Sequence, residues 1–239
     1  SNGLIDIKKF KKELHNYSDY IPIVSITACS NVTGVIQPID KIAKITHKHK
    51  GKIFIDFSAS APYVPINMHL DDAKGIFYDA IFLSPHKFSG GQMTPGVLIA
   101  NKYVHLNNVP YTPGGGTVRF VCKGATPVYS SDIETTENGG TPNILGIIRI
   151  ALCMRIKQIF LKEIYTHELF LTKYVNEKFI EIENKHPNFE YLNPKENINR
   201  LPIFVFRVKG YHYSYIVALL CDLFGITTRG GLSCASLIA

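Results

Sequence analysis

A lysine that follows a short apolar strand is the strongest candidate for chemistry in this sequence. The run from Ala80 to Ser84 reads as a buried strand, and it delivers Ser84, His86 and Lys87 into a turn that a glycine pair closes. A lysine amine there, beside a hydroxyl and an imidazole, suits a Schiff base with pyridoxal phosphate (PLP), with Ser84 and His86 hydrogen-bonding the phosphate. The alternative is an ordinary surface lysine at the end of a strand.

The segments around this lysine alternate between strand and helix. Strands are predicted at residues 21–28, 52–57, 80–84 and 96–100, and a helix at 38–50. This alternation predicts an α/β fold with a mainly parallel sheet and flanking helices, in which the strand at 96–100 is an antiparallel or edge neighbour. Ligands of such sheets bind at the carboxyl ends of the strands, so Asn31, Asp56 and Lys87 are expected to share one site.

The second half of the sequence predicts a different organisation. Residues 110–143 are rich in loops, and residues 144–185 form a long helical region that is interrupted or bent near Tyr165. A polar connection at 187–199, a strand at 201–208, a helix at 213–224 and a last strand at 226–229 follow. We therefore expect two domains, with residues 1–145 forming part of a larger domain and residues 146–239 forming a smaller C-terminal α/β domain.

Composition and charge narrow the classes of function. A chain of 239 residues that is 46% hydrophobic can bury a large core, and its apolar stretches are too short to span a bilayer. Five scattered cysteines without a Cys-x-x-Cys pair suit a reducing cytoplasm and argue against a disulfide framework or a zinc site. The net charge of +7 comes without a nucleic-acid-binding motif. We expect a cytoplasmic protein with no metal, membrane or nucleic-acid partner.

Six motifs in order carry a resemblance to a known family. They are Ser30-Asn31-Val-Thr-Gly-Val-Ile-Gln-Pro38, Ile55-Asp56, Ser84-Pro-His86-Lys87, Gly114-Gly-Gly116, Gly140-Thr141-Pro-Asn143 and Arg229-Gly-Gly-Leu-Ser-Cys234-Ala235. Each motif is weak alone, but their order and spacing resemble the class V aminotransferases, and within that family the cysteine desulfurases and selenocysteine lyases. The resemblance implies the large domain of the PLP-dependent transferase fold, type I, together with a small domain.

The resemblance implies a role in cofactor binding for each matching residue. Lys87 resembles the lysine that forms the Schiff base with PLP, and Asp56 resembles the aspartate that pairs with the pyridine nitrogen. Asn31 resembles the asparagine near the phenolic oxygen of the cofactor, although a simple turn residue is its serious rival. Ser84 and His86 resemble the phosphate and ring contacts that flank the lysine.

Three further positions bear on the substrate and on the subunit structure. Thr141 resembles a residue that reaches the phosphate in the neighbouring subunit's site, which implies a homodimer with shared active sites. Arg229 resembles an arginine close to the carboxylate of a small amino-acid substrate. Cys234 occupies the position of the persulfide-forming cysteine of one group of desulfurases, which would pass its sulfur to an acceptor protein. The alternative for Cys234 is a partly buried structural cysteine, because Gly231-Leu-Ser233 replaces the usual histidines.

Departures from the family pattern leave three interpretations open. Desulfurases carry a glutamine three residues after the pyridine-binding aspartate, whereas this sequence has Ala59. Family members are also considerably longer at the N-terminus, so the chain resembles a fragment. The first interpretation is a cysteine desulfurase-like enzyme, and the second is a class V aminotransferase or another PLP lyase without persulfide chemistry. The third is a non-catalytic, inactive fragment or dimerisation module.

Overall fold

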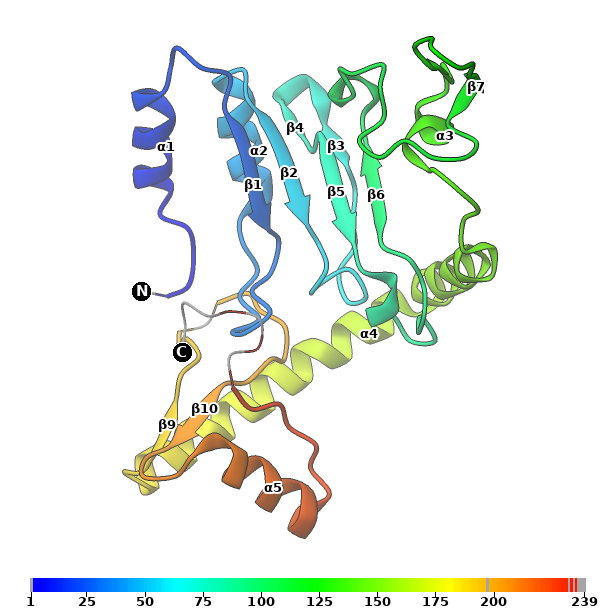
Figure 1. Cartoon of the computed structure of the whole chain (residues 1–239). Helices are drawn as coiled ribbons and strands as arrows, with labels where there is room; N and C mark the ends of the chain where they lie inside the picture. The colour runs from blue at the N-terminus through cyan, green and yellow to red at the C-terminus, as the bar shows by residue number, and fades with distance from the viewer. Residues whose placement is uncertain (1, 197, 232, 234, 236–239) are drawn as a thin grey trace.

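A four-stranded sheet forms the centre of the upper part of the molecule (Figure 1). The computed structural model describes residues 2–196, 198–231, 233 and 235. Strands β1 (Ile23–Thr27), β2 (Lys52–Asp56) and β5 (Ala80–Leu83) are parallel, and β6 (Val97–Ala100) pairs antiparallel with β5 at the edge. The predicted mainly parallel sheet and its antiparallel edge strand are confirmed.

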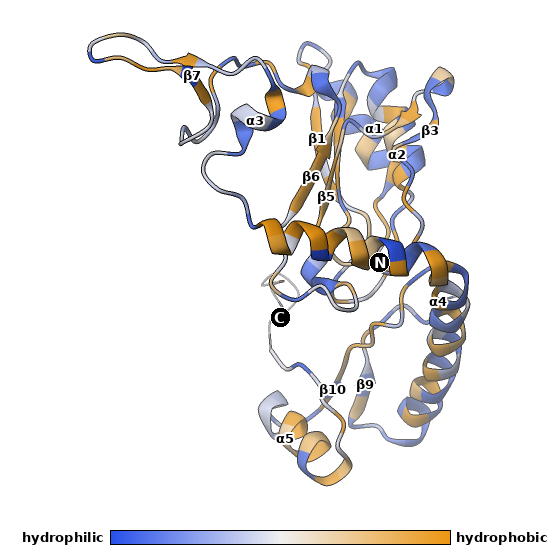
Figure 2. Ribbon diagram, turned by 90° about the vertical axis from the view of Figure 1, so that its right-hand side faces the viewer, coloured by the Kyte–Doolittle hydropathy of each residue, from blue (hydrophilic) through white to orange (hydrophobic). Residues whose placement is uncertain are grey.

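Helices α1 (Ile7–Asn16) and α2 (Ile39–Lys48) lie on one face of this sheet (Figure 2). Successive side chains of a strand point to opposite faces, and in β2 the fully buried residues are Ile53 and Ile55. These two pack in one core with Ile42 and Ala43 of α2. Asp56, at the end of β2, therefore faces the side of the sheet that α1 and α2 leave open.

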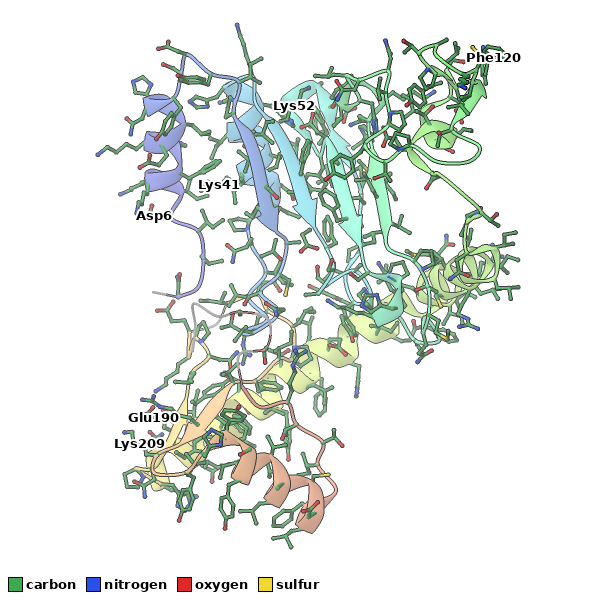
Figure 3. The ribbon with its side chains drawn as sticks, in the orientation of Figure 1. Asp6, Lys41, Lys52, Phe120, Glu190 and Lys209 are labelled. Atoms are coloured by element: carbon green, nitrogen blue, oxygen red, sulfur yellow. The ribbon has the colours of Figure 1, made fainter. Side chains whose placement is uncertain are left out.

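The amino ends of the strands are joined by a buried polar network around Asp79. Its carboxylate accepts hydrogen bonds from the Ile53 amide at 2.8 Å, His47 Nε2 at 2.9 Å and the Tyr103 hydroxyl at 2.9 Å. Lys52, labelled at the start of β2 in Figure 3, places its Nζ 3.3 Å from the same carboxylate. Burial raises the pKa of Asp79, but the hydrogen bonds and the Lys52 charge outweigh burial and lower this pKa overall.

Short elements complete the first half of the chain. Strands β3 (His69–Asp71) and β4 (Ile76–Phe77) form an antiparallel pair, and β4 packs against α2, where the Phe77 and His47 rings stack 3.9 Å apart. Strands β7 (Val118–Phe120) and β8 (Val128–Tyr129) and helix α3 (Ile133–Glu137) form a lobe beyond β6 (Figure 1). The predicted loop-rich region thus contains three brief elements.

Helix α4 (Ile144–Lys185) is continuous over its 42 residues and crosses the carboxyl end of the sheet (Figure 1). The sequence predicted that this helix is either interrupted or bent. Figure 2 shows that it bends, and it stays one uninterrupted helix. Among the described residues, no helix is long and apolar enough to cross a membrane.

The lower part of the molecule contains β9 (Phe189–Tyr191), β10 (Phe206–Val208) and α5 (Tyr213–Phe224). Strands β9 and β10 are antiparallel, and Glu190, which forms ion pairs with Arg207 and Lys209, joins them (Figure 3). These two cations lower the pKa of Glu190 to about 2. The division of the chain into domains at residue 145 stays a prediction.

Two predicted elements in this part are wrong. Strand β9 lies within residues 187–199, which were expected to be a polar connection. Residues 226–229 form no strand, because Gly225 ends α5 with φ of 65° and the Ile226 amide donates back to Leu220 O. The predicted strand at 201–208 is shortened to β10, since the Leu201 amide donates to Gly34 O instead.

Candidate functional site

Asp56 lies at the carboxyl end of the middle strand of the parallel part of the sheet. Its register partners are Thr27 of β1 and Phe82 of β5, so the three side chains share the open face. The Ser58 amide donates to Asp56 Oδ1 at 2.7 Å and orients the carboxylate. Within the described part of the chain, no group donates to Asp56 Oδ2, which leaves that oxygen available to a ligand.

The turn that carries Lys87 follows β5 directly. Residues Pro85–Lys87 form a single 3-10 turn in which the Lys87 amide donates to Ser84 O at 3.0 Å. The apolar neighbours Pro85 and Phe88 are buried and anchor the turn, whereas the side chains of His86 and Lys87 are exposed. Lys87 Nζ has no hydrogen-bond or ion-pair partner among the described residues. Buried anchors therefore present an unpartnered amine at the strand end.

Gly91 allows this turn to fold back on itself. A Cβ at Gly91 would lie only 1.9 Å from Pro85 O, a distance that no side chain tolerates. The Gly91 amide in turn donates to Phe88 O at 2.9 Å. The glycine noted in the sequence after Lys87 is thus required by the packing of the Lys87 turn.

Asn31 lies in a turn that follows β1 and that the C-terminal half of the chain holds. The Val32 and Thr33 amides donate to Ser30 Oγ, and the Gly34 amide donates to Ser30 O at 2.9 Å. Asn31 Nδ2 donates to Ser233 O at 2.8 Å. Asn31 thus connects the end of β1 to Ser233, four residues after Arg229 in the chain.

The contacts of this turn with residues 193–203 fix its position. Asn193 Nδ2 donates to Thr33 O at 2.7 Å, and the Leu201 amide donates to Gly34 O at 2.9 Å. Behind them, Arg200 is 4% exposed and donates to Asn176 Oδ1 and to the Tyr191 hydroxyl. The Asn31 turn is therefore bound to the lower part of the molecule through backbone and buried side chains.

Across the residues that the structure describes, the remaining predicted residues are not linked directly to Asp56 or to the Lys87 turn. Arg229 is exposed, and its neighbour Gly230 packs against the Tyr213 ring at the start of α5. Cys234 lies outside the described residues. Thr141 is exposed in the segment between α3 and α4, where the Gly140 amide donates to Gly115 O at 2.7 Å. In Figure 1 this segment runs down the β6 side of the molecule, away from β1 and β2.

Cys29 can be set aside as a nucleophile, although it is close to Asn31 in the sequence. It is 1% exposed, and its Sγ lies 3.1 Å from Gly34 O. Burial raises the pKa of the Cys29 thiol to about 12, so the thiolate required for nucleophilic attack is not formed near neutral pH.

Sequence reasoning missed one residue that contacts both loops of the site. Lys157 of α4 donates from Nζ to Val64 O at 2.6 Å, and its ammonium lies 5.9 Å from the centre of the Phe88 ring. Its only signal in the sequence is the spacing of four residues from Cys153 and eight from Arg149, which places all three on one side of a helix.

The arrangement fits a PLP-like cofactor. Asp56 has an oriented carboxylate with one oxygen that accepts no hydrogen bond from the described residues, which suits a protonated ring nitrogen. Lys87 is exposed and has no partner among the same residues, which suits a carbonyl group. Both groups follow adjacent parallel strands at their carboxyl ends, which is where ligands of such sheets bind. The individual roles of Asn31, Ser84 and His86 stay predictions.

The fold and this arrangement define a class of protein. The family model described as aminotransferase class-V matches residues 1–239, and the chain belongs to this family. Its architecture is the α/β fold known as fold type I of the PLP-dependent enzymes, as in the solved cysteine desulfurases.

The particular relatives are cysteine desulfurases. The chain is 30% identical over 236 residues to a cysteine desulfurase of Wigglesworthia glossinidia brevipalpis, covering 98% of this chain and 53% of that protein. A probable cysteine desulfurase of Halalkalibacterium halodurans matches with the same identity and coverage. The apo structure of the cysteine desulfurase from Thermococcus onnurineus NA1 superposes with a TM-score of 0.79 at 27% identity, over 98% of this chain and 55% of that one. The chain spans about half the length of the curated relatives it matches.

Proposed function

We propose that this chain is part of a PLP-dependent enzyme that acts on an amino acid, and that this enzyme is a cysteine desulfurase. The observation that carries the proposal is the convergence of the Asp56 carboxylate and the Lys87 turn on adjacent strands at one end of the sheet. The similarity to cysteine desulfurases supports this choice over other reactions of the family.

Each predicted site residue would have its own role in binding the cofactor or in the reaction. PLP, when bound, withdraws electrons from the substrate Cα. Lys87 would hold the cofactor covalently through Nζ and move the proton at the substrate Cα. Asp56 would keep the ring nitrogen protonated, because a carboxylate stabilises the cationic form of its partner. Ser84 and His86 would bind the phosphate and the ring, and Asn31 would bind the phenolic oxygen.

The sulfur chemistry belongs to the C-terminal segment. Arg229 would bind the carboxylate of cysteine as a bidentate partner. The Cys234 thiolate would attack the substrate sulfur, so that an S–S bond forms, the substrate C–S bond breaks and the carbon skeleton leaves as alanine. The resulting persulfide would then be passed to a sulfur-acceptor protein.

Further parts of the proposal concern assembly and location. Thr141 would complete the phosphate site of a neighbouring subunit in a homodimer, which agrees with its exposure in a segment on the β6 side of the molecule, away from β1 and β2. The scattered cysteines suit the cytoplasm, where thiols stay reduced.

Cofactor binding is tested with the full-length protein incubated with PLP and then reduced with borohydride. We expect the wild type to gain the visible absorbance of bound PLP and to carry the reduced cofactor on Lys87 in a peptide mass spectrum. Lys87→Ala loses both signals. Lys41→Ala, which removes an exposed lysine of α2, is the matched control and keeps them. Absence of both signals from the wild type would favour the non-catalytic module.

The reaction is tested by sulfide release from cysteine in the presence of a thiol reductant. We expect the release to fall at least tenfold in Cys234→Ala, because the acceptor of the substrate sulfur is lost. Cys221→Ala, a change at an exposed cysteine of α5, is the control and keeps the activity. Transamination by a wild type that releases no sulfide would instead identify an aminotransferase.

A further inference from the structure

One side of α4 contacts the segment that follows Lys87. Asn143, which caps the helix, donates to Met93 O at 3.0 Å, and Arg149 Nη1 donates to Gln92 O at 2.5 Å. Cys153 is 4% exposed and packs against Gly90, where a Cβ would lie 3.8 Å from its Sγ. Residues 149, 153 and 157 are four apart and lie on one side of the helix. This side of α4 therefore supports residues 88–93 from below.

Lys157 ends this row and differs from the others because it also contacts the loop after Asp56. Its Nζ donates to Val64 O, while the ammonium lies close to the Phe88 ring. The Lys157 side chain is half-buried, and burial lowers its pKa to about 8. Among the described residues, no carboxylate pairs with it. In the described part of the chain, the ammonium of Lys157 is therefore held by the Val64 carbonyl and the Phe88 ring.

The two partners of Lys157 belong to the two halves of the candidate site. Val64 is in the turn that begins at Asp56, and its amide donates to Ser60 O at 3.1 Å. Phe88 is 4% exposed and is the residue next to Lys87. A movement of either loop relative to the other would break one of the contacts of Lys157.

We propose that Lys157 is a positioning residue that joins the loop after Asp56 to the turn of Lys87 and so sets the spacing between the carboxylate and the amine. The meaning of that spacing for PLP rests on the proposed function, whereas the joining of the two loops does not.

The joining is tested without cofactor by hydrogen–deuterium exchange of the full-length protein. Lys157→Met keeps the apolar stem and removes the donor, so exchange is expected to rise together in residues 58–66 and 84–93. Lys162→Met, the same change at an exposed lysine of α4, is the matched control and leaves both segments unchanged. Lys157→Arg, which can still donate to Val64 O, restores protection of both. Unchanged exchange in Lys157→Met, or a rise in only one segment, would overturn the proposal.

The consequence for the site is tested by PLP titration of the same variants. We expect Lys157→Met to bind PLP about tenfold more weakly than Lys162→Met, the factor that corresponds to a hydrogen bond from a charged donor. The thermal midpoint and the far-UV spectrum should match those of the control, and Lys157→Arg should recover most of the affinity. Wild-type PLP affinity in Lys157→Met would refute the positioning role. Failure of the wild type to bind PLP would refute the proposed function and leave the exchange result to decide the joining.

Discussion

A change at Asp79 should strongly affect stability. Its fully buried carboxylate accepts three hydrogen bonds and faces Lys52. In Asp79→Asn the new amide NH2 group faces groups that themselves donate hydrogen bonds. The substitution also leaves His47 and Lys52 without their negatively charged partner. We expect the free energy of unfolding to fall by about 3 kcal/mol, as for other buried pairs that lose one partner. Urea unfolding of the full-length protein measures this loss.

The control and the pH dependence follow from the same carboxylate. Asp72 pairs with His69 on the exposed surface, and Asp72→Asn should change the free energy of unfolding by less than about 0.5 kcal/mol. Because the folded-state pKa of Asp79 lies below its ordinary 3.8, its contribution is present above that value and is lost as the pH falls through the lowered pKa. Asp79→Asn should therefore flatten the acid side of the stability profile. An equal slope in both proteins would contradict this.

The sequence allowed a site residue to be predicted only where that residue follows the end of a predicted strand. Asp56 and Lys87 follow short apolar runs, and parallel strands bring their carboxyl ends to one edge. Lys157 could not be found in this way, because a lysine in a long helix ordinarily reads as a solvated residue. The burial of Lys157 depends on a loop 93 residues earlier in the chain and on the Lys87 turn. The spacing of Lys157 from Cys153 and Arg149 does not indicate these contacts.

At the scale of elements, the Asn31 turn depends on Gly34. Its φ is +73°, and a Cβ there would lie 2.4 Å from Leu201 O. We expect Gly34→Ala to reduce the free energy of unfolding by about 2 kcal/mol or more, since left-handed strain and a backbone clash act together. Hydrogen exchange should also rise in residues 30–36, because the turn separates from residues 199–203.

Gly124→Ala separates the two contributions. Gly124 also has a left-handed φ, of +82°, but a Cβ there would meet no atom within 4 Å. This variant should lose only about 1 kcal/mol, the cost of the conformation alone. Equal losses in the two variants would show that the contact with Leu201 is unimportant.

Elements that are stabilised by contacts close in sequence were easier to predict than elements that depend on distant contacts. Helix α5 was predicted with its observed bounds, because its apolar run ends at a glycine that caps it locally. Strand β9 was missed, because its three residues become a strand only through pairing with β10, which begins 15 residues after β9 ends. Helix α1 was also not foreseen, although Asp6 caps it with two hydrogen bonds to backbone amides.

At the scale of the whole molecule, the proposed homodimer makes a prediction about mixed subunits. If Thr141 serves the neighbouring site, a dimer of one Lys87→Ala and one Thr141→Ala subunit contains one site with both defects and one intact site. Mixing and refolding the two full-length variants should then restore PLP affinity at up to half of the sites that contain Lys87. If Thr141 served its own subunit, the mixture would bind no more tightly than Thr141→Ala alone.

The contact between Asn193 and Thr33 joins positions 160 residues apart in the chain. A ribosome adds roughly 5–20 residues per second, so the Asn31 turn is made many seconds before the segment that holds it. During that interval β1 and β2 can pair, while the turn beyond β1 has none of its later partners. The order of synthesis therefore makes the Asn31 turn one of the last parts of the site to gain its contacts, because its partners Asn193 and Ser233 follow it by 160 and 202 residues.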